Sequence, residues 1–227
     1  MNSYIIAYCS GKRKEEKTMK KLHVVITLTE PILGTSPNDS DIYRNFIGNK
    51  APDALSLEEE VAAVGADEVA EKGMTVFARN GEGKPILWDY QLKGFFKDAC
   101  SMLSRVGGKG EDGKKKKVNE SSKLTAYKKV IDGLIFVEPR QIPIEFEGEI
   151  GCCQRPLRAQ TLQGERVTLA MSEEIPAGAK IEFDVICLAD ENIAVVKEWL
   201  DYGILRGLGQ WRNSGKGRFT YIAEEDA

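Results

Sequence analysis

The chain has 227 residues, of which 42% are hydrophobic, 30% charged and 8% aromatic, and its formal net charge is −3. These proportions are typical of a globular protein and exclude the collagen-like and disordered classes. The apolar runs are far shorter than the roughly 18 residues that cross a bilayer, so we expect no membrane partner. The five cysteines include no C-x-x-C pair, and the first residues do not form a secretory signal. Neither a disulfide framework nor a zinc site is indicated, and the cytoplasm is the expected compartment.

The charges are distributed unevenly along the chain. Residues 53–71 contain seven acidic side chains and no basic one, whereas residues 105–129 contain nine basic and three acidic side chains. Residues 203–219 contain four basic side chains and no acidic one. The small total charge therefore does not exclude a polyanionic ligand.

The first half of the chain contains one clear strand and one clear helix. Residues 22–29 alternate between apolar and polar side chains, which predicts a strand with one buried face. Residues 91–106 carry apolar side chains at spacings of three and four, which predicts an amphipathic helix. Between them we predict an insertion at about residues 36–75, and then a hairpin with strands at 74–79 and 85–87.

The second half of the chain is predicted to be richer in strands. A basic, glycine-rich segment at about 105–122 has the composition of a mobile loop. Residues 1–18 are predicted to be a disordered extension, so that a single domain spans 19–227. The order of elements predicts an α+β fold with helices on one face of an antiparallel sheet, for which the split β-α-β unit is the simplest motif. The later predicted elements are strands at 133–137, 142–146, 166–171 and 180–188, a helix at 193–202 and a last strand at 219–223.

The sharpest motif is the glycine-rich loop, residues 205–219, with the sequence LRGLGQWRNSGKGRF. Its glycines allow a ligand to approach the backbone closely, and its interleaved cations can contact phosphates. Its spacing matches neither a P-loop nor a dinucleotide-binding motif. A hairpin with solvated charges is the alternative, in which the tryptophan packs under the loop instead of stacking on a base. The candidate ligand-binding residues here are Arg206, Gly207, Gly209, Trp211, Arg212, Gly215, Lys216, Gly217 and Arg218.

Two further segments complete a pattern with this loop. They are LTEPILGT at 28–35 and PILWDYQLKGFFK at 85–97. In this order the three segments resemble the RAMP superfamily, the RNA-binding proteins that build CRISPR effector complexes in antiviral defence, and most closely its backbone subunits that bind guide RNA. The resemblance implies a ferredoxin-like, RRM-related core. Trp88-Asp89-Tyr90 stands where the family usually has a proline-glycine-serine entry.

The resemblance also implies residues that contact RNA. Lys93 and Lys97, near the head of the predicted helix, would bind phosphates, and a helix amino terminus itself attracts phosphate. Independently of the resemblance, Arg155 and Arg158, beside a predicted proline turn, could pair with phosphate or with the acidic segment. His23, the only histidine, is predicted on the open face of the first strand, where it could stack on a base or serve a structural role.

The resemblance further raises the question of catalysis. In some backbone subunits of the family, an aspartate after the first strand cleaves RNA with a metal ion. Here Asp39 and Asp41 follow that strand and could hold Mg²⁺, although turns also use such residues to satisfy their own backbone.

The predicted function is binding of single-stranded RNA, a guide RNA in particular, within a complex that contains other effector-type subunits or further copies of this chain. No enzymatic activity and no cofactor are expected on this hypothesis. One alternative is an Mg²⁺-dependent endoribonuclease that uses the two aspartates. The other is a virus-encoded protein-interaction module that takes the place of a subunit.

Overall fold

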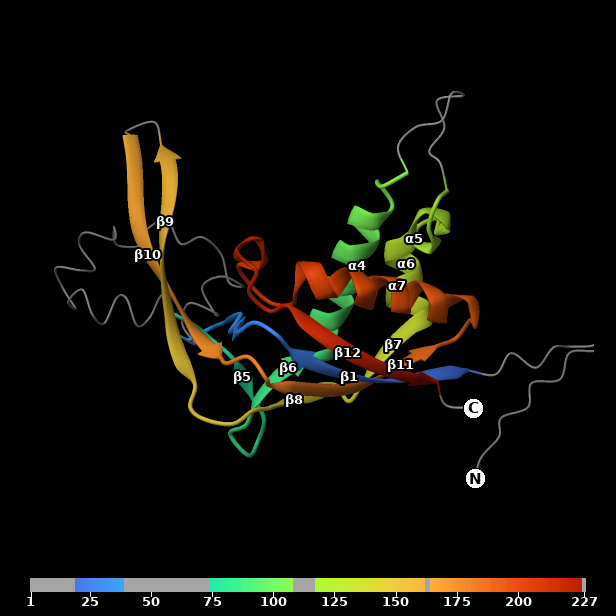
Figure 1. The fold of residues 1–227 in the computed structure, drawn as a ribbon, viewed down its shortest axis with the longest axis horizontal. Coiled ribbons are helices and arrows are strands. Elements are labelled where there is room, and N and C mark those ends of the chain that lie inside the picture. Colours follow the sequence, from blue (N-terminus) through green and yellow to red (C-terminus); the bar gives the residue numbers. More distant parts are fainter. Residues whose placement is uncertain (1–18, 39–73, 108–116, 162–163, 226–227) are drawn as a thin grey trace, which may run out of the picture.

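The computed structural model describes residues 19–38, 74–107, 117–161 and 164–225. Its main sheet has the strand order β12-β1-β11-β8-β6-β5, and β7 also pairs with β11. Helices cover one face of this sheet (Figure 1). The strands are β1 (Lys20–Leu28), β5 (Ala78–Arg79), β6 (Pro85–Trp88), β7 (Ile135–Glu138), β8 (Gln141–Glu145), β11 (Lys180–Cys187) and β12 (Phe219–Glu225). The helices are α4 (Asp89–Leu103), α5 (Glu120–Lys123), α6 (Tyr127–Leu134) and α7 (Glu191–Arg206).

The connection of these elements defines the fold. Along the chain they follow the order β1, α4, β7, β11, α7, β12, and in the sheet the four strands lie in the order β12-β1-β11-β7. Each neighbouring pair is antiparallel. Two interleaved split β-α-β units give this arrangement, which is the ferredoxin-like fold. The predicted α+β class is therefore confirmed.

The hydrophobic core lies between the sheet and the helices. Leu22, Val24 and Ile26 of β1 are fully buried on the helix side, as the alternation in this strand predicts. Phe96 of α4 packs against Trp199 of α7 with a distance of 5.3 Å between the ring centroids. The two helices therefore pack against each other as well as against the sheet. None of the helices in the described residues is long and apolar enough to cross a membrane.

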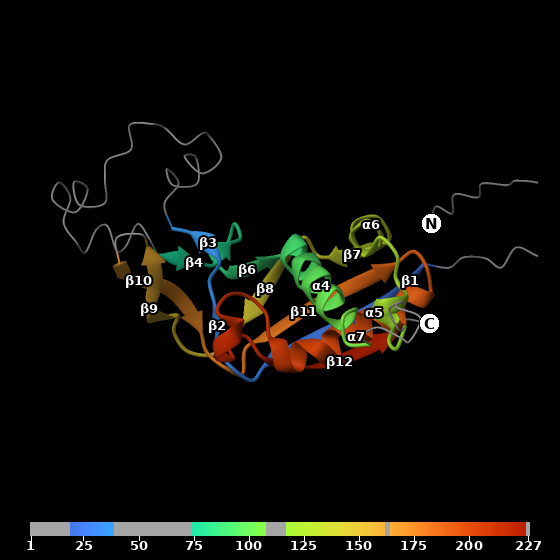
Figure 2. The ribbon, with the colours of Figure 1, turned by 90° about the horizontal axis from the view of Figure 1, so that it is seen from above.

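A second, smaller sheet lies at one end of the main sheet (Figure 2). It comprises β2 (Ile32–Leu33), β3 (Ser36–Pro37), β4 (Thr75–Val76), β9 (Gly151–Thr161) and β10 (Gly164–Ile175). β9 and β10 form a long hairpin that projects from the rest of the molecule (Figure 1). β3 and β4 pair at the two ends of the segment predicted as an insertion, and residues 39–73 between them lie outside the described part.

The proline turn predicted around residues 154–158 is wrong, because these residues lie inside β9. Pro156 stands opposite Leu169 of β10 in a continuous antiparallel ladder. Among the described strands β9 pairs only with β10, so its other edge needs no ladder hydrogen bond from Pro156. Edge strands accept proline for this reason.

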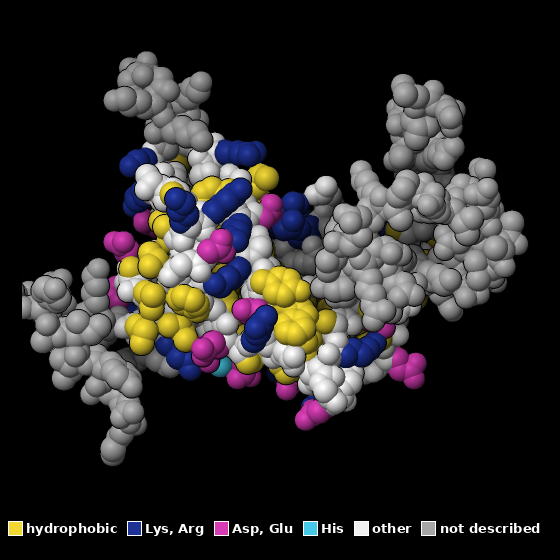
Figure 3. Space-filling view, turned by 180° about the vertical axis from the view of Figure 1, so that it is seen from behind, with side chains coloured by type: hydrophobic (Ala, Val, Ile, Leu, Met, Phe, Trp, Pro, Cys, Tyr) yellow, Lys and Arg dark blue, Asp and Glu magenta, His cyan; other side chains and the backbone are white. Residues whose placement is uncertain are grey.

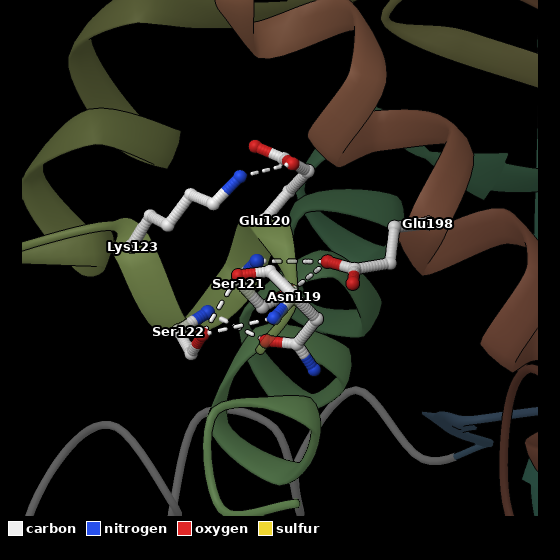
Figure 4. Close-up of polar contacts among 6 residues, drawn as sticks. All are labelled: Asn119, Glu120, Ser121, Ser122, Lys123 and Glu198. Atoms are coloured by element: carbon white, nitrogen blue, oxygen red, sulfur yellow. Dashed lines mark hydrogen bonds and ion pairs between the residues drawn. The ribbon is translucent and has the colours of Figure 1, made fainter. Parts of the chain in front are cut away.

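The short helix α5 overlaps the end of the segment predicted as a mobile loop, of which residues 108–116 lie outside the described part. Its N-cap is Asn119, whose Oδ1 accepts a hydrogen bond from the backbone N–H of Ser122 at 2.9 Å. Glu198 of α7 accepts two hydrogen bonds from Ser121, from its N–H at 2.8 Å and from its hydroxyl at 2.6 Å (Figure 4). A helix of one turn is only marginally stable by itself. The two hydrogen bonds to the carboxylate of Glu198 attach α5 to α7 and stabilise it.

Candidate nucleic-acid interface

The glycine-rich loop connects α7 to β12, and its two arms touch. The backbone N–H of Leu208 donates a hydrogen bond to the carbonyl of Gly217 at 2.8 Å. A Cβ atom at Gly217 would lie 2.0 Å from the carbonyl oxygen of Leu208, and one at Gly207 would lie 2.5 Å from that of Lys216. Both glycines also have a positive φ, which L-residues rarely adopt. The contact between the arms therefore requires glycine at both positions.

Backbone and amide hydrogen bonds tie the loop to the turn that follows β1. The N–H of Gly217 donates to the carbonyl of Pro31, and the N–H of Thr29 donates to the carbonyl of Arg218, each at 2.8 Å. The side chain of Gln210 donates to the carbonyl of Gly34 at 2.7 Å. Two of the three segments that carry the family resemblance, 28–35 and 205–219, are thus direct neighbours in space.

Two arginines of this region share one carboxylate of α4. Arg206 Nε lies 3.3 Å and Arg212 Nη1 lies 2.8 Å from the same oxygen of Asp98. Arg206 also donates to Asn213 at 2.8 Å, which joins its guanidinium group to the loop. Because each guanidinium has five N–H donors, donors remain for a further anion.

The other two cations of the loop differ in their surroundings. Lys216 forms an ion pair with Glu174 of β10 at 2.7 Å and is largely shielded from solvent. Arg218 is exposed, and its side chain makes no hydrogen bond or ion pair within the described part of the chain. An exposed, unpaired guanidinium beside two arginines and a lysine is well suited to contact a phosphate.

Trp211 holds an unusual position at the tip of the loop. Its φ is +52°, although it is not a glycine, and its side chain is 41% exposed. The guanidinium carbon of Arg155, from β9, lies 5.2 Å from the centre of its ring, and Arg155 Nη2 donates to Gln210 at 3.0 Å. A backbone conformation this rare for a bulky residue is maintained by its surroundings and is often found at functional sites.

Arg155 itself is 8% exposed, and its Nη1 atom is buried without a hydrogen-bond partner among the described residues. A buried cationic donor without a partner is costly unless an acceptor reaches it. Arg155 is therefore part of the same site as the loop residues, since its guanidinium group lies against the ring of Trp211.

Lys93 and Lys97 lie on a different side of α4. Lys97 forms an ion pair with Asp132 of α6 at 2.6 Å, and Lys93 Nζ lies 4.7 Å from the ring centre of Phe136. Figure 3 draws the face of the molecule on which α6 and the neighbouring part of α4 lie, and Lys and Arg side chains form a line there beside hydrophobic side chains. The glycine-rich loop lies on the opposite side, next to α7 (Figure 2). The predicted phosphate contacts thus divide into two separate surfaces.

His23 lies on the sheet face that the helices leave open, as its position in β1 predicts. Its Nδ1 is 2.8 Å from Asp184, and its Nε2 is 3.6 Å from Glu182. Lys21 forms an ion pair with the same Asp184 at 2.8 Å. Carboxylates on this face repel phosphate, so His23 is better placed for a structural ion-pair network than for contact with RNA.

Three further candidate residues have no described side chain. Asp39 and Asp41 lie outside the described residues, and so does the side chain of Arg158. Elsewhere in the described part of the chain, no three His, Cys, Asp or Glu side chains meet in a group that could hold a metal ion. The Mg²⁺ hypothesis therefore stays a prediction for Asp39 and Asp41.

Two residues of this site were not selected from the sequence. Asp98 organises two arginines, and Gln210 joins Arg155 to the turn after β1. Gln210 could have been selected, since it lies inside the glycine-rich motif. Asp98 could not, because its partners are more than 100 residues away in the chain.

Comparison with known proteins finds matches among solved structures. No protein-family model matches the chain, and no curated protein matches it. Among solved structures, the chain is similar to a chain in the cryo-EM structure of the Type III-B Cmr-beta bound to cognate target RNA. The identity is 11%, the TM-score is 0.49, and the match covers 91% of this chain and 60% of the other. The chain thus spans less than two thirds of the length of the protein that it matches.

Proposed function

We propose that the chain binds single-stranded RNA through the RNA backbone, with the glycine-rich loop as the principal contact. The observation that carries this proposal is the arrangement of the cations. Four cations of the loop and Arg155 of β9 gather at one place, and among the described residues only two carboxylates, Asp98 and Glu174, pair with them. Such a surplus of positive charge attracts polyanions independently of their sequence.

Trp211 favours a single strand over a duplex as the ligand. Its exposed ring, supported from one side by Arg155, offers a surface on which an unpaired base can stack. Stacking of bases on aromatic side chains contributes about 1–3 kcal/mol per base and tolerates any sequence. Bases inside a duplex are already stacked and cannot use this surface.

The more specific part of the proposal is that the RNA is a guide RNA and that the chain acts as a subunit of a CRISPR-type ribonucleoprotein complex, with other subunits or copies of itself as partners. It rests on the three sequence segments that resemble the RAMP superfamily. Two of them touch through the loop and the turn after β1, and the third, at the start of α4, lies beside them. Gln91 of α4 donates to Thr35 of that turn at 2.6 Å.

The test is a titration of a fluorescent single-stranded RNA of about 40 nucleotides across a range of salt concentrations. The variant Arg212→Ala/Lys216→Ala/Arg218→Ala should bind more weakly, and its log affinity should fall less steeply with log salt because fewer phosphates are neutralised. The matched control Lys84→Ala/Lys123→Ala/Lys197→Ala removes the same charge from three exposed ion pairs on other elements, and should leave the slope unchanged.

Two results would contradict the proposal: no binding by the wild type at low salt, or equal losses in the loop variant and the control. Addition of Mg²⁺ provides a further readout. Shortening of the RNA that depends on Mg²⁺ would favour the endoribonuclease alternative, and Asp39→Ala and Asp41→Ala would then be the variants to examine.

A further inference from the structure

A small pocket opens between the glycine-rich loop and the first turns of α4. Its volume is about 240 Å³. Leu92 and Phe95 of α4 and Leu208 of the loop form its apolar floor, and Gln91 and Arg212 lie at its rim. An apolar floor with a few polar groups at the rim is the usual composition of a small-molecule site.

We propose that this pocket receives one unstacked base of the RNA that the glycine-rich loop binds. The inference rests on the proposed function, because the loop supplies the phosphate contacts. Pockets that enclose drug-sized ligands measure roughly 300–1,000 Å³, so a volume of about 240 Å³ suits a single planar ring. Arg212 at its rim, together with the other cations of the loop, attracts a polyanion, and the flat, largely apolar part of a nucleic acid is its base.

Hydrogen bonds within the chain hold the polar side chains of the rim in place. Gln91 accepts a hydrogen bond from the N–H of Trp88 at 2.8 Å and donates one to the hydroxyl of Thr35 at 2.6 Å. The hydroxyl oxygen of Thr35 is thereby an acceptor, and its own hydrogen is given to no acceptor in the described residues. This hydrogen and the remaining N–H groups of Arg212 are donors for the edge of a base.

Gly94 creates part of the open space. Gly94 lines the pocket and lies away from the ends of α4, at a position where glycine stabilises a helix less than alanine does. A Cβ atom at Gly94 would meet no atom within 4 Å. A larger side chain therefore fits the fold at this position and would occupy the pocket. Gly133 of α6 offers a matched control, since it is also a helical glycine whose Cβ would meet nothing within 4 Å.

The experiment compares Gly94→Leu with Gly133→Leu in the RNA titration across salt. Filling the pocket should weaken binding by roughly 5- to 150-fold, which is the loss of affinity expected when one base can no longer stack. The slope of log affinity against log salt should stay the same, because no phosphate contact is removed. Gly133→Leu should bind like the wild type. The RNA affinity of Gly94→Ala, which favours the helix and fills less of the pocket, should lie between those of Gly94→Leu and the wild type. Thermal unfolding of each variant is the control for folding.

The outcomes separate this inference from the proposed function. Salt-dependent binding that is equal in Gly94→Leu and Gly133→Leu overturns the base pocket and leaves the phosphate-binding loop intact. A weaker dependence of log affinity on log salt in Gly94→Leu also overturns the base pocket, because the substitution would then act on the phosphate contacts. Absence of RNA binding by the wild type overturns the proposed function, and the base pocket with it.

Discussion

Asp184 is the residue around which the open face of the sheet is organised. Partial burial would raise its pKa, but the hydrogen bonds and charges of Lys21 and His23 outweigh burial and lower the pKa of Asp184 below its ordinary value of 3.8. The carboxylate therefore stays ionised in the folded chain at pH values where the unfolded chain already binds a proton. Its contribution to stability is present above the ordinary pKa and is lost as the pH falls through the folded pKa.

This sign leads to a prediction on acid stability. Between about pH 5 and pH 3, the free energy of unfolding of the wild type should fall more steeply than that of Asp184→Asn, which has no carboxylate to protonate. Urea unfolding at a series of pH values measures both slopes. Glu182→Gln, which removes an exposed carboxylate from the same strand, should retain the steep slope of the wild type. Equal slopes in the wild type and Asp184→Asn would show that this ion pair is not coupled to folding.

At the scale of elements, one carboxylate of α7, that of Glu198, accepts two of the hydrogen bonds that attach α5 to its neighbours. Ser121 is 1% exposed, and its hydroxyl both donates to Glu198 and accepts a hydrogen bond from Trp199 at 3.0 Å. Cys100 lies beside it, and burial raises the pKa of this thiol to about 11. Polar groups as buried as these are costly when a partner is lost.

We therefore expect Glu198→Ala to reduce the free energy of unfolding by about 1–3 kcal/mol, because two donors of Ser121 lose their acceptor. Hydrogen exchange of the amides in residues 117–124 should become faster. Glu120→Ala, which removes an exposed partner of Lys123, should cost between about 0 and 1 kcal/mol. Equal costs in the two variants would mean that the contact with α7 does not hold α5 in place.

Elements with strong periodicity could be predicted from the sequence, and those defined by long-range contacts could not. The alternation in β1 and the apolar spacing in α4 indicate a strand and a helix that the structure confirms, with the helix starting at Asp89 instead of residue 91. The ferredoxin-like core is implied by the family resemblance together with the order of the elements. α6 was missed, although its apolar residues Tyr127, Val130, Ile131 and Leu134 stand at helical spacing. β9 was missed because Pro156 indicates a turn unless the strand is known to lie at an edge.

At the scale of the whole molecule, α4 separates two basic surfaces. The glycine-rich loop meets it through Asp98, and Lys93 and Lys97 lie on the side that faces α6. The sequence could indicate both sets of cations, because clustered lysines and arginines are visible in it. It could not indicate that they lie on different sides, since the ion pairs with Asp98 and Asp132 depend on the packing of α7 and α6 against α4.

This separation predicts how substitutions combine. If a long RNA contacts both surfaces, the loss of binding free energy in Lys93→Ala/Lys97→Ala should add to that of Arg212→Ala/Lys216→Ala/Arg218→Ala within about 0.5 kcal/mol, as for distant sites without shared partners. Affinity measurements on the two variants and their combination form the double-mutant cycle. A coupling above about 1 kcal/mol would place the two surfaces in one network.

Asp98 gives the loop a property beyond attraction. Its carboxylate presents to Arg206 and Arg212 the same kind of charged oxygen that a phosphate would present, and it forms an ion pair with both guanidinium groups. If the loop binds RNA as proposed, an incoming phosphate would meet aligned donors but would have to compete with Asp98 for them. This competition would lower the affinity for single anions, so that a ligand with several phosphates in register would be favoured.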